Sequence, residues 1–382
     1  MDHKIESIIL LGPGIDIFPI TTMEYPKFTL RILNKPLLVH NIQWLEKKSS
    51  KIYIIGLEYY QVTVNNYLEE FKLSEKTEFI PISQYDGSVN SLLRICKKIK
   101  SKNILVTKGD IITNIDVSSI LEEYFYGRCK IMTVLIRTNT GHKLMGYSGN
   151  NLVYYTVNSM DILNEKKFEM FQKFPNITFS TEMDTSQVYV LDKSLLEYEE
   201  SFFSFKASFL PFLIENLREK CPVKVMRVDS GYYFQINSIE AFIKASLAKK
   251  QSSFIPQWIL NGEGEIFEYK NCCRQTLKKI SFKDQNEDVR NIVGKKFLPG
   301  DFYLYNSIIG NNCRIGKGTR ILSSIILDNT KIGENCLIQD SIIGESVVIC
   351  DRCFLKTCKI MPKYVFSEAI KASSEIFSLG EL

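Results

Sequence analysis

Cysteine and histidine are the side chains of this sequence that most readily suggest chemistry, because both bind metals and both act in catalysis. Cys350-Asp-Arg-Cys353, followed by Cys358, has a spacing at which thiolates could bind zinc. The histidines show no spacing that would pair one of them with an acid or a nucleophile: they are His3, His40 and His142. His40 lies within an apolar helical pattern, so packing is a better prediction for it than catalysis.

A 17-residue repeat from Ser307 to Ile360 offers another explanation for the cysteines. Aliphatic residues recur in steps of six, six and five, at Ile309, Ile315, Ile321, Ile326, Ile332, Ile338, Ile343, Ile349, Leu355 and Ile360. Three short strands per coil, each with one aliphatic side chain inside, are typical of a left-handed parallel β-helix. Cys336 and Cys353 are one repeat apart, so stacking on adjacent coils accounts for them without a metal.

Two other residue types keep the same register. Serines recur at intervals of 17, and we expect them to stack from coil to coil: Ser307, Ser324 and Ser341. Glycines follow inward positions at Gly310, Gly316, Gly333 and Gly344. We expect these glycines to form turns with positive φ, the conformation that glycine adopts at least cost.

The first part of the chain alternates strand and helix patterns, which predicts βαβ units on a mostly parallel sheet. The predicted strands are 7–11, 51–57, 78–83, 103–107, 130–137, 187–191 and 223–228, and the predicted helices are 37–48, 62–71, 88–99, 117–126, 205–220 and 236–247. Sheets of this kind bind ligands beyond the C-terminal ends of their strands. The loops at 12–27 and 109–114 are therefore the places to expect a ligand.

These patterns divide the sequence into an α/β domain at 1–248, a connector at 249–302 and a left-handed β-helix domain at 303–382. The 382 residues are 45% hydrophobic, and no apolar run approaches the ~18–20 residues of a membrane span. A net charge of +5 without a long basic run does not indicate nucleic-acid binding. The ten scattered cysteines and the absence of a signal-peptide pattern at the N-terminus predict a cytosolic protein.

The order of domains and the loop after the first strand resemble the nucleotide-sugar pyrophosphorylases. The loop Gly12-Pro-Gly14-Ile-Asp-Ile-Phe-Pro-Ile-Thr21, followed by Pro26-Lys27 and Asn34-Lys-Pro36, is similar to the family signature of a glycine turn, an arginine, Pro-Leu-Thr, Pro-Lys and Asn-Lys-Pro. The resemblance implies a nucleotide site in which Gly12 and Gly14 let backbone N–H groups approach a triphosphate. Lys27 would neutralise its charge.

The sequence departs from this signature where the chemistry requires charge. Asp16 stands in place of the phosphate-binding arginine, and a carboxylate there repels a triphosphate. Lys108-Gly-Asp110 matches the element that supplies the first metal carboxylate, although an aspartate that only caps the turn is an alternative. Gln235 falls where the second carboxylate belongs, and an amide cannot replace it for Mg²⁺; Asp229 reaches that place only with an insertion. We therefore expect no catalytic residues, no metal, no cofactor and no transferase activity.

Inactive relatives with this architecture include the gamma subunits of eukaryotic translation initiation factor 2B, which the chain resembles at 171–181 and 231–245. The resemblance implies a non-catalytic subunit of the guanine-nucleotide exchange factor for translation initiation factor 2. It would pair with the epsilon subunit, join the alpha, beta and delta subunits, and contact neither membrane nor nucleic acid. Epsilon subunits add a C-terminal α-helical domain; no such pattern follows residue 360, which favours gamma.

Two alternatives stay open at this point. The first is an active nucleotidyltransferase that makes a nucleotide-activated sugar with Mg²⁺ and uses Lys27, Asp110 and Asp229. The second is an α/β domain that binds nucleotide as a regulatory signal without turnover, since Gly12, Gly14 and Lys27 remain.

Overall fold

A computed structural model of the chain describes residues 4–32, 34–137, 144–156, 174, 176–197, 202–217, 222–229, 232–247, 267–270, 276–279, 291–298 and 300–378. It contains two compact units, which we call the sheet unit (Met1–Gly12 and Asn41–Tyr233) and the β-helix unit (Pro13–His40 and Phe234–Leu382). His3, His142 and most of the segment 157–175 lie outside the described residues. Within the described part of the chain, no helix has the length and apolar content needed to cross a membrane.

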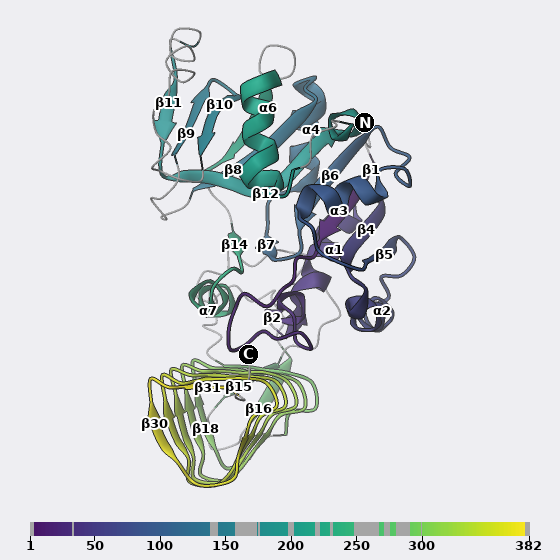
Figure 1. Cartoon of the computed structure of the whole chain (residues 1–382). Helices are drawn as coiled ribbons and strands as arrows, with labels where there is room; N and C mark the ends of the chain where they lie inside the picture. The colour runs from purple at the N-terminus through teal and green to yellow at the C-terminus, as the bar shows by residue number, and fades with distance from the viewer. Residues whose placement is uncertain are drawn as a thin grey trace. The chain divides into compact units, whose positions relative to one another are not determined.

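The sheet unit is built on a ten-stranded mixed sheet of order β11-β9-β10-β13-β8-β12-β6-β1-β4-β5 (Figure 1). Its strands are β1 (Ile5–Leu10), β4 (Ser49–Leu57), β5 (Thr77–Ile82), β6 (Asn103–Lys108), β8 (Ile131–Arg137), β9 (Leu144–Ser148), β10 (Asn151–Thr156), β11 (Thr178–Ser180), β12 (Met183–Asp192) and β13 (Val223–Val228). Strands β6, β1, β4 and β5 run parallel, whereas β12 is antiparallel to both β6 and β8. All six residues of β1 are buried, including Glu6 and Ser7, so its sequence does not alternate between apolar and polar residues.

Helices follow the strands much as the sequence predicts. They are α1 (Leu37–Glu46), α2 (Gln61–Glu70), α3 (Ser88–Ile95), α4 (Val117–Tyr126), α6 (Leu210–Leu217) and α7 (Ile239–Leu247), with short helical turns η1 (Lys27–Thr29), η2 (Glu58–Tyr60) and η3 (Lys193–Leu196) and a π-helix η4 (Phe205–Phe209). The Asp116 side chain caps α4 by accepting a hydrogen bond from the Ser119 N–H. Helix α6 packs on β10, and α4 on β8 and β13. The helix predicted at 205–220 thus begins as a π-helix, and its predicted last residues, 218–220, lie outside the described residues.

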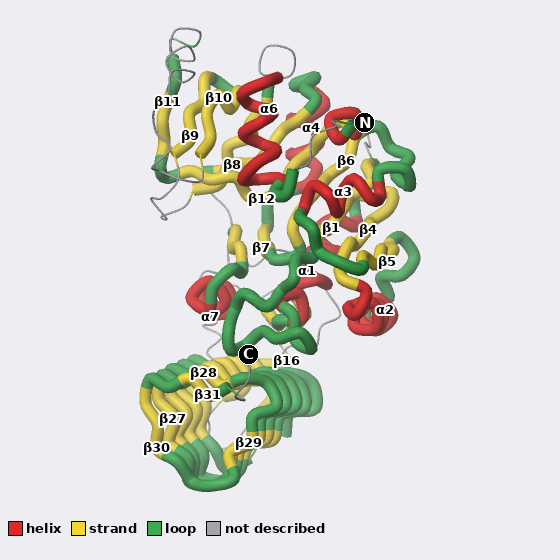
Figure 2. The backbone as a smooth tube through the Cα atoms, in the orientation of Figure 1, coloured by secondary structure: helices red, strands yellow, loops and turns green. Residues whose placement is uncertain are grey.

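The β-helix has three parallel ladders of short strands, with turns at the corners of each coil (Figure 2). The first contains β17 (Ile292–Val293), β19 (Ile308–Ile309), β22 (Ile325–Ile326), β25 (Ile342–Ile343), β28 (Lys359–Ile360) and β31 (Ile376–Phe377). The second contains β18 (Tyr303–Tyr305), β21 (Arg320–Leu322), β24 (Leu337–Gln339), β27 (Phe354–Lys356) and β30 (Lys371–Ser373). The third contains β20 (Arg314–Ile315), β23 (Lys331–Ile332), β26 (Val348–Ile349) and β29 (Val365–Phe366).

The interior of the β-helix confirms the predicted register. Residues at the repeat positions form one core cluster, with Ile315 partly buried against it. The predicted serine stack is also confirmed, because the hydroxyl of Ser307 accepts a hydrogen bond from the Ser324 N–H, and that of Ser324 from the Ser341 N–H. Cys336 and Cys353 are buried at equivalent corners, as the stacking explanation predicts. A sheet of Rossmann-like type followed by a parallel β-helix is the predicted fold class.

The expectation of positive φ at the β-helix glycines is wrong. Positive φ falls instead on other corner residues, among them Asn312 (55°), Asn329 (59°) and Asn335 (54°). Glycine is required for another reason, since a Cβ at Gly310 would lie 2.6 Å from the backbone nitrogen of Asp328. At Gly316, Gly333 and Gly344, as at Gly310, a Cβ would lie less than 3 Å from backbone atoms of the next coil.

Two boundaries of the β-helix unit differ from the sequence-based division. Strand β17 pairs with β19, so the first ladder begins within the predicted connector. A hairpin of β15 (Phe267–Lys270) and β16 (Thr276–Lys279) adds to the same ladder, with β15 antiparallel to β17. The segment Pro13–His40, which the sequence places in the α/β domain, belongs to the β-helix unit. This segment contains the short hairpin of β2 (Arg31–Ile32) and β3 (Lys35–Pro36).

Candidate functional site

The loop that carries the pyrophosphorylase-like signature is organised around Gly14. Its φ of 70° lies in the left-handed region, and its carbonyl accepts a hydrogen bond of 2.7 Å from the Lys27 N–H. A Cβ at Gly14 would lie 3.1 Å from both the Lys27 backbone nitrogen and the Pro26 Cβ. Conformation and space therefore both favour glycine here, and the turn places Gly14 against the predicted lysine.

The Lys27 side chain turns toward the residue that departs from the family signature. Its Nζ lies 2.7 Å from the Oδ2 of Asp16, and the lysine side chain is only 11% exposed. Lys27 begins the helical turn η1, which follows Pro26 directly. The cation that the resemblance assigns to a triphosphate is therefore paired with a carboxylate of the same loop.

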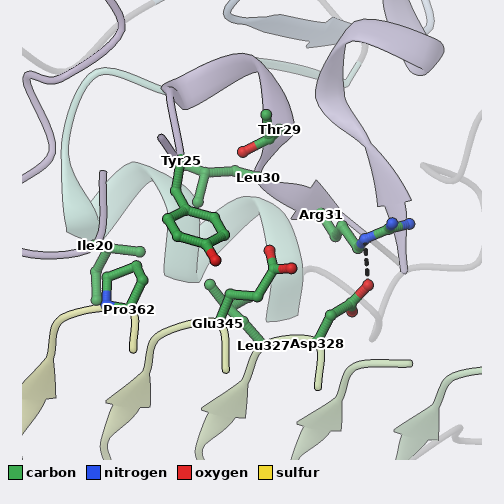
Figure 3. Close-up of a pocket in the computed structure, with 9 residues that line it drawn as sticks. All are labelled: Ile20, Tyr25, Thr29, Leu30, Arg31, Leu327, Asp328, Glu345 and Pro362. Atoms are coloured by element: carbon green, nitrogen blue, oxygen red, sulfur yellow. Dashed lines mark ion pairs between the residues drawn. The ribbon is translucent and has the colours of Figure 1, made fainter. Parts of the chain in front are cut away.

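The end of the loop is fastened to the β-helix. Arg31 Nε lies 2.7 Å from Asp328 Oδ2, and both side chains are largely buried (Figure 3). An Arg31 guanidinium N–H also donates to the carbonyl of Asn34, which holds the turn between β2 and β3 closed. The Asn34 amide donates to the carbonyl of Ile309 at 3.1 Å. We call this set of contacts between Arg31, Asn34, Asp328 and Ile309 the clasp.

A pocket of about 280 Å³, including solvent at its mouth, lies beside the clasp (Figure 3). It is lined by Ile20, Tyr25, Thr29, Leu30, Arg31, Leu327, Asp328, Glu345 and Pro362. Burial, and then the nearby Asp328 carboxylate, raise the pKa of Glu345 to about 7, while Arg31 opposes the shift. The pocket is acidic on the β-helix side and aromatic on the loop side, where Tyr25 points toward Glu345.

The other two predicted site residues belong to the sheet unit. Gly12 follows β1, and a Cβ there would meet no atom within 4 Å, so local packing does not require glycine. Asp110 lies in the turn between β6 and β7 (Ile111–Thr113) and is buried. The structure brings Gly14 and Lys27 together within the β-helix unit, while Gly12 and Asp110 lie in the sheet unit. Asp229 is exposed just after β13.

A second pocket, of about 270 Å³ including solvent at its mouth, lies in the sheet unit where parallel strands β1 and β6 end. Its lining includes Leu10, Val106, Thr107, Lys108, Gln187, Tyr189 and Lys206, the last from η4. The Lys206 ammonium lies 2.8 Å from the Asp184 carboxylate, and both side chains are buried. The other Asp184 oxygen accepts hydrogen bonds from the Tyr155 hydroxyl and the Thr185 N–H. This is where a parallel sheet is expected to bind ligands.

The sequence contained a signal for this second pocket that we did not use. Strand β12 begins well before the predicted strand at 187–191 and includes four consecutive buried polar residues, Asp184, Thr185, Ser186 and Gln187. Gln187 has a φ of 61°, and the pairing of β12 with β8 is irregular at this point. Buried polar side chains beside a β-bulge are common at functional sites, because the bulge redirects side chains.

The described part of the chain contains no group of three or more His, Cys, Asp or Glu side chains that could hold a metal ion. His40 packs inside the β-helix unit, as predicted, with its Nε2 2.8 Å from the carbonyl oxygen of Ile32. Burial, with a smaller contribution from the charge of Lys35, lowers the pKa of His40 to about 3. Cys272 and Cys273 lie outside the described residues.

Comparison with known proteins finds matches that cover different shares of the chain. The family model of the GMPPB C-terminal domain matches residues 304–378. The bifunctional protein GlmU of Methanococcus maripaludis is 33% identical over 115 residues, which are 30% of this chain and 26% of that protein. GlmU of Methanococcus vannielii is 32% identical over the same shares. The chain thus spans about a quarter of the length of these curated relatives.

A longer match is found with translation initiation factor eIF2B subunit gamma of Schizosaccharomyces pombe, which is 21% identical over 329 residues, covering 76% of this chain and 70% of that protein. Among solved structures, HddC from Yersinia pseudotuberculosis aligns with a TM-score of 0.51 and 18% identity, over 64% of this chain and all of that one. The chain is similar to the nucleotide-sugar pyrophosphorylase-like proteins. At these identities the structural likeness concerns the fold alone.

Proposed function

We propose that this chain is a non-catalytic, gamma-type subunit of the guanine-nucleotide exchange factor for translation initiation factor 2. The observation that carries the proposal is the match to the S. pombe gamma subunit, because it extends over 76% of this chain, whereas the GlmU matches extend over 30%. In this role the chain pairs with an epsilon subunit to form the exchange-active subcomplex, which joins the alpha, beta and delta subunits. Its own part is to bind epsilon and to help hold initiation factor 2.

The signature loop supports the non-catalytic part of the proposal. Charge neutralisation by lysine and arginine is most of what a nucleotidyltransferase provides to a triphosphate. Here Asp16 replaces the arginine and its carboxylate lies 2.7 Å from the Lys27 ammonium. A triphosphate approaching this loop meets one cation that is already paired and one added negative charge.

The test is co-expression of the chain with the epsilon subunit from the same organism, followed by size-exclusion chromatography and a GDP-release assay on initiation factor 2. We expect a stoichiometric complex that releases GDP faster than epsilon alone. Epsilon expressed without this chain is the control for release. Two separate elution peaks, with a release rate equal to that of epsilon alone, would refute the proposal.

The second candidate is a nucleotidyltransferase, which the GlmU and GMPPB-type matches favour. It would release pyrophosphate from a nucleoside triphosphate and a sugar 1-phosphate in the presence of Mg²⁺. A coupled pyrophosphate assay on the purified chain distinguishes the two functions. If turnover is found, Lys27→Met and Asp110→Asn should each abolish it, since those residues are the ones the family resemblance assigns to phosphate and metal.

A further inference from the structure

The coil of β25, β26 and β27 carries a cysteine at two positions of one corner, and the first of these is glycine in the two coils before it. The position of Gly316 and Gly333 is occupied by Cys350, one repeat later. The position of Thr319 and Cys336 is occupied by Cys353. In the repeat 307–360, this is the corner where both positions carry a thiol.

The two thiols lie against each other. Their sulfur atoms are 3.5 Å apart. Residues 350–353 form a tight turn in which Arg352 has a φ of 60°. The ends of such a turn have Cα atoms less than about 7 Å apart, which overlaps the separation that a disulfide spans. Bond formation requires only a small approach of side chains that already point toward one another.

Solvent reaches the two thiols unequally. Cys350 is partly exposed, whereas Cys353 is buried in the β-helix interior. Burial, followed by the contact with Cys353, raises the pKa of the Cys350 thiol, so the reactive thiolate is a minor species at pH 8 and its exchange with a disulfide is slow. Neighbouring thiols point elsewhere, since Cys336 Sγ donates to the Cys350 carbonyl and Cys358 Sγ to the Lys356 carbonyl.

We propose that Cys350 and Cys353 are a dithiol modification site that a low-molecular-weight disulfide such as glutathione disulfide oxidises to an intramolecular disulfide. The Cys350 thiolate attacks one sulfur of glutathione disulfide and displaces one glutathione thiolate. The Cys353 thiolate then attacks Cys350 Sγ and displaces the second. The protein loses two electrons and two protons, and the product is two molecules of reduced glutathione.

Among the described residues, the same geometry does not offer the ligand set of a zinc centre. Structural zinc needs four ligands in a tetrahedron. The cluster of Cys350, Cys353 and Cys358 that the spacing suggested does not form, because no group of three metal-ligating side chains occurs in the described part of the chain. Cys336 and Cys358 are instead engaged with backbone carbonyls.

The sequence makes the test unusually direct, because trypsin cleaves after Arg352, between the two cysteines. The full-length chain is incubated with glutathione disulfide at pH 8, quenched with acid, denatured and alkylated with N-ethylmaleimide. Mass spectrometry is expected to find the peptides 332–352 and 353–356 joined, with fragmentation placing the bond on Cys350 rather than Cys336. Excess reduced glutathione should separate them again.

Two matched variants come from the repeat itself. Cys350→Gly restores the residue of the two preceding coils, and Cys353→Thr restores that of Thr319, so both are expected to fold. Each should lose the linked peptides and leave its remaining thiol as a glutathione adduct or free. The proposal is wrong if, after oxidation, Cys350 and Cys353 of the unsubstituted chain each carry N-ethylmaleimide or a glutathione and are not joined to each other. It is also wrong if the joined peptides are linked through Cys336 instead.

Discussion

Arg31 and Asp328 are 2.7 Å apart at Nε and Oδ2, although they stand near opposite ends of the sequence. The pair fastens the loop with the pyrophosphorylase-like signature to a corner of the β-helix (Figure 3). In a nucleotidyltransferase such a loop must fold around a triphosphate. Here its charged groups are committed to protein partners, Lys27 to Asp16 and Arg31 to Asp328.

Removal of the arginine from the clasp should destabilise the β-helix unit. Arg31→Ala leaves the Asp328 carboxylate, whose side chain is 7% exposed, without its ion-pair partner. We expect the free energy of unfolding to fall by about 3 kcal/mol, the scale for breaking a buried ion pair. Urea denaturation followed by circular dichroism measures it. Lys317→Ala, at an exposed pair with Asp301, is the control and should change it by less than about 0.5 kcal/mol.

Glu345 should give the stability of this unit a pH dependence of defined sign. Its pKa is about 7 in the folded state against 4.5 for the ordinary side chain, so the folded chain binds the additional proton between these values. The free energy of unfolding therefore falls as pH rises from about 4.5 to 7. Burial, and then Asp328, favour the proton, while Arg31, Asn329 and Lys363 oppose it.

Comparison with Glu345→Gln isolates this contribution, because the other titrating groups cancel in the difference. We expect the glutamine variant to be more stable than the unsubstituted chain at pH 8, by up to about 3 kcal/mol, and the gain to vanish near pH 4.5. Denaturation midpoints at four or five pH values suffice. A difference that is constant with pH would mean that Glu345 titrates normally in the folded chain.

The buried pair in the sheet unit should behave non-additively. Lys206→Met leaves Asp184 buried with hydrogen-bond donors but no cation, and we expect a loss of about 3–5 kcal/mol. Lys206→Met combined with Asp184→Leu removes both charges and should lose less than the single lysine variant. Chemical denaturation of the two single variants and the double variant gives the coupling energy. Strict additivity would mean that the ion pair contributes nothing.

Alanine substitutions should distinguish a glycine that packing requires from one that packing does not require. Gly333→Ala places a Cβ 2.6 Å from the Asp351 backbone nitrogen on the next coil, so we expect a loss of at least about 2 kcal/mol. Gly12→Ala meets no atom within 4 Å and should leave thermal stability nearly unchanged. Thermal melts of both variants test this contrast. Equal melting temperatures would show that the coils can separate enough to admit a methyl group.

The β-helix interior could be predicted from the sequence because one residue of each short strand points inward. The aliphatic residues therefore recur with the 17-residue period of the coils. The same repeat contains a second row that we did not interpret: Ile308, Ile325 and Ile342 point away from the interior cluster and are nevertheless buried. An outward apolar row indicates that another segment covers that face. It does not identify the segment.

The clasp could not be predicted from the sequence, because the outward apolar row does not identify the segment that covers it. Arg31 and Asp328 are related by no periodicity, and a single charged residue in a loop is normally solvated. The resemblance moreover assigned the whole segment 13–40 to the α/β domain, because its motif belongs there. The buried polar site at Asp184 would have been easier to predict, since four consecutive polar residues within a strand are unusual. The nucleotide-binding roles of Gly12, Gly14, Lys27 and Asp110 stay predictions.

The clasp can form only late in the synthesis of the chain, because its two sides lie far apart in the sequence. The ribosome adds 275 residues after Asn34 before the carbonyl of Ile309 exists to accept its hydrogen bond. At typical rates of about 5–20 residues per second, that interval is roughly 14 to 55 seconds. By then the sheet unit, which ends at Tyr233, has fully emerged, while the residues between Gly12 and Asn41 still lack their partner. In the nascent protein this loop therefore lacks its clasp partners until the coils that carry Ile309 and Asp328 are made, and during that time it is open to chaperones and proteases.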